Sequence, residues 1–212
     1  ASVFALWLHA RTGQPAPEPL RALLGDDATT EADWAADARE HVEELIGQLD
    51  EWTPAPPLSL VEELRGWGEV AVTHVIQDLT GVVDARRWTS RRLPHLVRLA
   101  GEFGQASAIL PLLRVLISGS NETAGRAAGV ALARIGPKAL DRLRALAEDP
   151  SADLDARMDA MSALAALAVL YPASADAVVE CLYKQMECSE DYPEDVPSIL
   201  AALIAETGHP RA

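Results

Sequence analysis

The chain has 212 residues, nearly half of them hydrophobic and few of them aromatic, and it carries a net charge of −14. This length suffices for one large or two small hydrophobic cores, and this composition excludes an intrinsically disordered chain. No apolar run reaches the roughly 18 residues that a bilayer-spanning helix needs, so we expect no membrane segment.

Residues 1–56 are predicted to form a divergent N-terminal helical section. Residues 3–27 read as a helix, a proline-rich turn and a short helix, without the basic segment of a secretion signal. A long amphipathic helix follows over residues 31–52. Its apolar stripe, which we expect in the core, consists of Trp34, Ala38, Val42, Leu45, Leu49 and Trp52. The proline-rich segment 53–57 then leads into the repeat region 57–212.

Four stretches of the repeat region align, and each reads as a helix, a tight turn and a second helix. They are LVEELRGWGEVAVTHVIQDL, LVRLAGEFGQASAILPLLRVLI, VALARIGPKALDRLRALAED and LAALAVLYPASADAVVECLYKQM. The junction residues, 32 or 36 positions apart, are Gly68, Gly104, Gly136, Pro172 and Gly208. Glycine suits a helix C-terminus because it adopts a left-handed backbone without a Cβ penalty. The predicted helix N-caps are Ser120 or Asn121, Ser151 or Asp153, and Ser174.

One helix of this region carries a recognisable pattern. RMDAMSALAAL follows the spacing R-x-x-A-x-x-A-L-x-x-L with Arg157, Ala160, Ala163, Leu164 and Leu167. It resembles the first helix of a HEAT-like repeat of the bacterial phycocyanobilin-lyase type. GRAAGVALARIG is similar, but Gly125 stands at the arginine position and Arg126 comes one place later. The resemblance implies an all-α fold, namely a right-handed α-solenoid of HEAT-like helical hairpins that forms a single continuous domain.

The sequence favours no catalytic or metal site. It has no nucleophile elbow, glycine-rich phosphate loop or H-E-x-x-H motif. Asp33, Asp37, His41 and Glu44 share a face of the long helix at a spacing that could ligate a cation. Without a cysteine or second histidine, that face is more typical of a solvated helix surface. We therefore predict no enzyme, no cofactor and no metal.

The two cysteines, Cys181 and Cys188, lie seven residues apart. On an amphipathic helix this spacing is typical of small core residues, and it is poorly placed for a disulfide. A reduced, cytoplasmic setting is therefore expected.

Charge is distributed unevenly, with a net of −11 over residues 1–80, +7 over residues 81–147 and −10 over residues 148–212. The basic side chains of the middle segment are the candidate partner-binding residues: Arg86, Arg87, Arg91, Arg92, Arg114, Arg134, Lys138, Arg142 and Arg144.

Their positions on the predicted helices suggest two groupings. Arg91 and Arg92 are expected in the early part of a helix, where backbone N–H groups favour anions. Lys138 and Arg142 share a face of a second helix, the helix that lines the concave side in HEAT-like proteins. With Arg114 one repeat earlier, they are expected to form a basic ridge.

Three interpretations of the basic residues are open. They pair with acids of the chain itself, such as Asp84, Asp141 and the acids of segment 147–153. Alternatively, they bind an acidic surface or peptide of another protein. The third interpretation is nucleic acid, by analogy with HEAT-like DNA glycosylases that act on alkylated bases, but the net charge and the presence of only two lysines disfavour it.

We expect a non-enzymatic protein-binding scaffold or adaptor that docks an acidic partner on its concave surface. The alternatives are a DNA-binding or DNA-repair enzyme on the same fold, and an acidic inhibitor or immunity protein.

Overall fold

The computed structural model describes residues 31–51, 58–188 and 193–210, and over these ranges the protein contains helices and no strands. The all-α prediction is thereby confirmed. The chain divides into two compact units, residues 1–78 and residues 79–212. The helices expected over residues 3–27 and the section boundary expected at residue 57 lie outside the described residues.

The first unit is built around a long helix. Its described elements are α3 (Glu31–Gly47), the 3-10 helix η1 (Gln48–Glu51), α4 (Leu58–Gly66) and the first part of α5 (Glu69–Asp84). The stripe predicted on the long helix is buried at Ala38, Val42, Leu45 and Leu49. The side chains of Trp34 and Trp52 lie outside the description.

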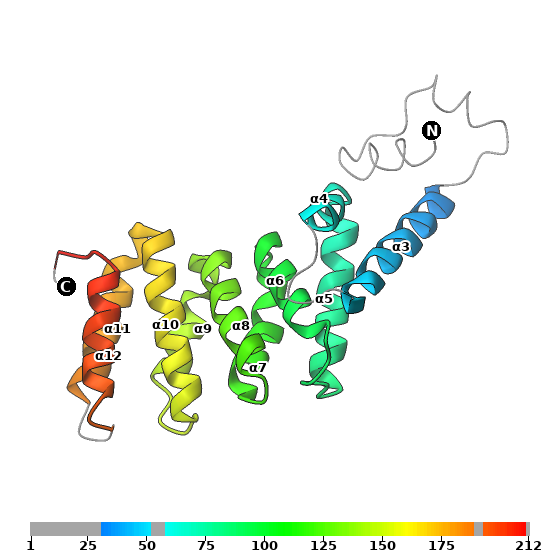
Figure 1. Ribbon diagram of the computed structural model, residues 1–212. Coiled ribbons are helices and arrows are strands. Elements are labelled where there is room, and N and C mark those ends of the chain that lie inside the picture. Colours follow the sequence, from blue (N-terminus) through cyan, green and yellow to red (C-terminus); the bar gives the residue numbers. More distant parts are fainter. Residues whose placement is uncertain (1–30, 52–57, 189–192, 211–212) are drawn as a thin grey trace. The chain divides into compact units, whose positions relative to one another are not determined.

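Over its described residues, the second unit comprises the end of α5, three helical hairpins and a final helix, in the chain order drawn in Figure 1. The hairpins are α6 (Leu93–Phe103) with α7 (Ile109–Ser118), α8 (Glu122–Ile135) with α9 (Pro137–Ala147), and α10 (Leu154–Leu170) with α11 (Ala175–Glu187). The final helix is α12 (Val196–Glu206). The 3-10 turns η2 (Ala106–Ala108) and η3 (Pro172–Ser174) lie inside the first and third hairpins.

The predicted glycine junctions do have the backbone that favours glycine. Gly104 ends α6 in the left-handed region, with φ 65° and ψ 23°. Gly136 between α8 and α9 also has a positive φ, 82°, but its ψ of −147° is extended. Pro137 explains this difference, because the residue before a proline avoids helical ψ values. Gly68 and Gly208 have positive φ as well.

The helix starts resolve the alternatives left by the sequence. Asn121, not Ser120, caps α8 by accepting a hydrogen bond from a backbone N–H of the first turn. Asp153, not Ser151, does the same for α10. Ser174 occupies the N-cap position of α11 without a side-chain hydrogen bond.

The helices of the second unit form two layers. The first layer consists of α6, α8, α10 and α12, which lie side by side (Figure 1), and the second layer consists of α7, α9 and α11. The first two second-layer helices also reach the following hairpin, since α7 lies against α8 and α9 against α10. Small residues let neighbouring helices of the first layer approach each other closely. A Cβ on Gly101 of α6 would lie only 2.6 Å from the Cβ of Ala131 on α8.

Polar side chains join neighbouring hairpins at a nearly constant separation along the sequence. Asn121 donates a hydrogen bond to the carbonyl of Trp88, 33 residues earlier. Tyr171 donates to the carbonyl of Arg134, 37 residues earlier, and Arg134 itself bonds Glu102, 32 residues earlier. These separations match the predicted repeat period, so successive hairpins meet in a similar register.

Arg157, the arginine of the HEAT-like pattern, has a structural role. Its Nε donates to the carbonyl oxygen of Ala147 at 3.2 Å, and its Nη2 donates to Oε1 of Gln185 at 2.9 Å. Ala147 is the last residue of α9, so the guanidinium satisfies a carbonyl that the helix end leaves open. Arg126 does not play this role on the preceding hairpin, because it is exposed and pairs with Glu122 on its own helix.

Candidate functional site

The first group of predicted site residues lies in the turn between α5 and α6. Arg86, Arg87 and Arg91 are exposed there and make no ion pair with the residues that the structure describes. Arg92 is half-buried at the N-cap position of α6. The prediction that Arg91 and Arg92 lie within the early helix is wrong. The helix begins just after them, with a proline in its first turn, a position that proline favours.

Two further arginines are neutralised by acids of neighbouring helices. Arg114 on α7 forms an ion pair with Asp84 at the end of α5, one of the acids that the sequence offers as an internal partner. Arg134 on α8 pairs with Glu102 on α6. Exposed ion pairs of this kind contribute only about 0–1 kcal/mol each to stability, but they reduce the charge that the two guanidinium groups offer to a ligand.

Arg144 belongs to a polar cluster between α9 and α11. Its guanidinium lies 3.8 Å from Glu148, whose other carboxylate oxygen accepts a hydrogen bond from Lys184 at 2.6 Å. That bond holds the pKa of Glu148 below its usual value. Burial and the adjacent Glu148 raise the pKa of the Cys181 thiol to about 11. The cluster therefore joins the two helices around a protonated thiol.

The last two predicted site residues, Lys138 and Arg142, are solvent-exposed cations of α9. Both are exposed, one turn apart on α9, and neither makes an ion pair with a described residue. On α7, Leu110 and Ile117 are 59 % and 49 % exposed on either side of Arg114. Arg114 and Arg142 are each the sixth residue of their helices, so these positions correspond between the two hairpins. We call Leu110, Arg114, Ile117, Lys138 and Arg142 the second-layer stripe.

The described residues contain no group of His, Cys, Asp and Glu arranged to hold a metal ion. On the α3 face considered above, His41 lies 4.0 Å from Glu44 and 3.3 Å from Glu63 of α4. The side chains of Asp33 and Asp37 lie outside the description.

The two cysteines are both free but differ in exposure. Cys181 is buried, as the sequence predicts for a core residue of α11. Cys188 is exposed, so its assignment to the core is wrong. The helix ends at Glu187, and the helical spacing on which the assignment rests does not extend to Cys188.

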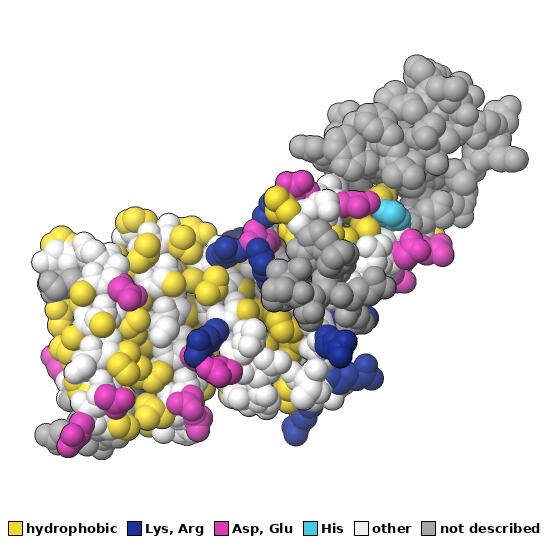
Figure 2. All heavy atoms as spheres, in the orientation of Figure 1, with side chains coloured by type: hydrophobic (Ala, Val, Ile, Leu, Met, Phe, Trp, Pro, Cys, Tyr) yellow, Lys and Arg dark blue, Asp and Glu magenta, His cyan; other side chains and the backbone are white. Residues whose placement is uncertain are grey.

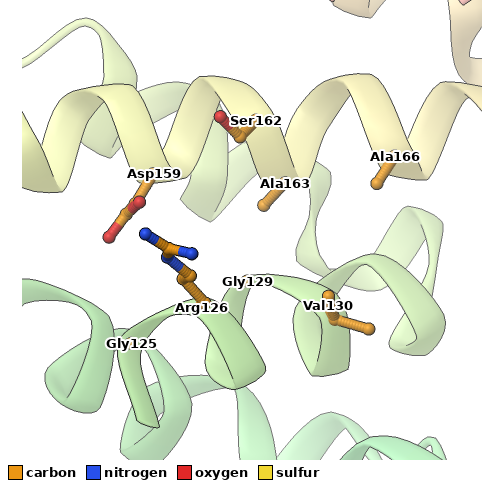
Figure 3. A pocket seen from close by; sticks show the side chains of 8 residues that line it. All are labelled: Gly125, Arg126, Gly129, Val130, Asp159, Ser162, Ala163 and Ala166. Carbon is orange, nitrogen blue, oxygen red and sulfur yellow. The ribbon is translucent and has the colours of Figure 1, made fainter. Parts of the chain in front are cut away.

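A groove of about 300 Å³ lies between α8 and α10 in the first layer (Figure 3). Its walls consist of Gly125, Arg126, Gly129 and Val130 from α8, and Asp159, Ser162, Ala163 and Ala166 from α10. The two glycines keep the groove open because neither has a side chain to fill it. Val130 is 52 % exposed at the end away from Asp159. The groove thus has a charged end and an apolar end.

The charged end is predominantly acidic. Figure 3 shows Arg126 and Asp159 pointing toward one another, but the ion pair of Arg126 is with Glu122. Asp159 makes no hydrogen bond or ion pair with the described residues. Burial, together with the nearby carboxylate of Asp155, raises the pKa of Asp159 above its usual value.

The sequence predictions do not include this groove. The predicted helix–turn–helix pattern gives no reason to expect open space between two helices. The one local signal is the spacing of Gly125 and Gly129, one turn apart inside a helix whose other residues are mostly strong helix formers. Figure 2 shows hydrophobic side chains over the visible face of α10 and α12, with Asp and Glu scattered among them.

Comparison with protein families, characterised proteins and solved structures finds no match to this chain. Within the described residues, no helix is both long enough and apolar enough to span a membrane.

Proposed function

We propose that the chain is a right-handed α-solenoid of HEAT-like hairpins, related to the phycocyanobilin-lyase type, and that it acts as a protein-binding scaffold. Two observations support this architecture: the first-layer helices lie side by side, and contacts between hairpins recur at about one repeat length. A stack of hairpins supplies a long, preformed surface, which suits an adaptor. A reduced, cytoplasmic setting suits the two free thiols.

The exposed cation pair on α9 carries the proposal. Lys138 and Arg142 are unpaired among the described residues, whereas Arg114, Arg134 and Arg144 each contact an acid. An acidic segment of a partner would bind both cations, with Arg142 offering bidentate hydrogen bonds to a carboxylate. Apolar side chains of the same segment would cover the exposed apolar residues of the second-layer stripe.

We infer action by binding rather than by catalysis. The buried Cys181 keeps its proton at neutral pH because its pKa is raised to about 11, and a protonated thiol is a poor nucleophile. A nucleic-acid ligand is less well supported, since the net charge of −14 repels a polyanion at long range.

Affinity purification with quantitative mass spectrometry tests the proposal. Wild type is compared with the double variant Lys138→Glu/Arg142→Glu. The matched control Arg39→Glu/Arg98→Glu reverses two exposed arginines that belong neither to the predicted site residues nor to the groove, and it changes the net charge equally. We expect that wild type and the control retain an acidic protein, and that the α9 variant recovers about tenfold less of it. Partly exposed ion pairs contribute roughly 0.2–1 kcal/mol each to binding, and the variant removes two of them.

Equal recovery of the same proteins by all three chains would contradict the proposal. Binding of a short DNA duplex at about 50 mM salt, lost steeply as salt is added, would point to the nucleic-acid alternative instead.

A further inference from the structure

We infer that the groove between α8 and α10 is a docking site for a short helical segment of a partner protein that carries a Lys or Arg beside apolar side chains. The groove lies in the first layer, whereas the second-layer stripe lies on α7 and α9. This inference does not depend on the proposed function, and it assigns the scaffold a second surface of opposite charge.

The dimensions of the groove suit a few side chains. From Asp159 to Ala166 the groove follows α10 for seven residues, or about 10 Å at the rise of an α-helix. A volume of about 300 Å³ is at the lower end of the range for small-molecule pockets. A ligand helix of two to three turns would cover this length and insert side chains spaced by three or four residues.

The walls favour a helix over an extended peptide. Both walls are α-helices, whose backbone N–H and C=O groups bond within their own helices. An extended peptide in the groove would bury backbone N–H and C=O groups without hydrogen-bond partners, which disfavours its binding. A helical ligand satisfies its own backbone and presents only side chains.

The charge of the groove determines the sign of the ligand. Asp159 faces the groove without an ion-pair partner among the described residues, and Asp155 lies one turn before it. Glu122 on α8 adds a third carboxylate, against the single cation of Arg126. A Lys or Arg from the ligand would compensate this excess of negative charge, whereas an acidic side chain would be repelled.

The other end of the groove offers apolar contact. Val130 and Ala166 line it, and Val169 continues the same face of α10 and is 54 % exposed. These side chains lack the contacts that would bury them within the chain. An apolar residue one or two turns from the ligand cation would cover them, and the burial of this apolar surface would strengthen binding.

The probe is a phage-displayed library of random twelve-residue peptides, selected on the full chain. Enriched peptides are synthesised with a fluorescent label, and their Kd values are measured by anisotropy. Among the enriched peptides whose binding survives Lys138→Glu/Arg142→Glu, we expect more Lys and Arg than Asp and Glu. Ala166→Phe, which fills the apolar end, should weaken binding about tenfold or more, and the nearly isosteric Asp159→Asn about three- to tenfold.

Matched controls use the same substitutions on the exposed face of α9. Ala145→Phe and Asp141→Asn should leave the Kd unchanged, as should Lys138→Glu/Arg142→Glu. Far-ultraviolet circular dichroism verifies that each variant is folded. The inference is overturned if no enriched peptide binds independently of Lys138 and Arg142, if the peptides that do are acidic, or if their binding is insensitive to Ala166→Phe or Asp159→Asn. The unchanged Kd of the α9 variant keeps this test separate from that of the proposed function.

Discussion

A close contact between two helices of the first layer gives a sharp test of the fold. At Gly101 on α6, an added Cβ would lie 2.6 Å from the Cβ of Ala131 and 2.7 Å from its Cα. The second distance involves backbone, so no side-chain rotation relieves it. Gly101→Ala would therefore force α6 and α8 apart.

The size of the effect follows from comparison with Gly129 on α8. There an added Cβ would lie 3.6 Å from the Cβ of Ala163, an ordinary contact. At Gly101 the helices would have to separate by about 1 Å to reach the same distance. Overpacking costs about 1–3 kcal/mol, and replacing a helical glycine by alanine gains roughly 0.8–1.0 kcal/mol. We expect Gly101→Ala to lower the free energy of unfolding by about 1–2 kcal/mol and Gly129→Ala to raise it by about 0.5–1 kcal/mol.

Urea unfolding followed by circular dichroism at 222 nm measures both variants against wild type. Both variants replace a helical glycine by alanine, so the difference in helix propensity is the same in each and cancels in the comparison. Changes of opposite sign in the free energy of unfolding therefore report the local spacing of the helices. A Gly101→Ala variant as stable as wild type would refute the close approach of α6 and α8. A loss of more than about 1 kcal/mol in Gly129→Ala would likewise refute the looser contact between α8 and α10.

Three further outcomes follow from individual side chains. Arg157→Ala removes one hydrogen bond to the preceding hairpin and one within its own hairpin, and should lower the free energy of unfolding by about 1–3 kcal/mol, measured in urea. The pKa of Asp159 is raised in the folded chain, so ionisation of this carboxyl opposes folding at pH values above about 3.8, its pKa in the unfolded chain. Asp159→Asn should therefore melt at a higher temperature than wild type near pH 7, with no difference attributable to this charge below about pH 3, where the carboxyl is protonated in both states. Ellman's reagent should modify Cys188 rapidly in the native chain and reach the buried Cys181 only after denaturation, giving one fast thiol and then two in total.

The local features of the fold are accessible from the sequence because they depend on nearby residues. A glycine at a helix junction, such as Gly104, and a capping residue, such as Asn121 or Asp153, act within one turn. The apolar stripe from Ala38 to Leu49 is likewise set by helical periodicity. The glycine pattern predicts the backbone less reliably where a neighbouring residue restricts it. Pro137 does so at Gly136, which has an extended ψ in place of the expected left-handed conformation.

The candidate surfaces are harder to predict because they depend on contacts about one repeat apart. Nothing near Arg134 in the sequence indicates that Glu102, 32 residues away, neutralises it, while Arg142 finds no such acid among the described residues. The groove depends on the separation of two helices, which the identities of Gly129 and Ala163 do not specify by themselves. The sequence thus indicates a basic segment, and only the register of the hairpins distinguishes its paired arginines from its open ones.

Site-specific photo-crosslinking tests the central claim, that the exposed face of α9 binds an acidic protein. A benzophenone amino acid replaces Ala145, which is exposed on α9 three residues after Arg142. We predict a discrete crosslink to an acidic protein in cells of the source organism, and its loss when Lys138→Glu/Arg142→Glu is added. No discrete crosslink, or one that persists unchanged after the charge reversal, would contradict the account.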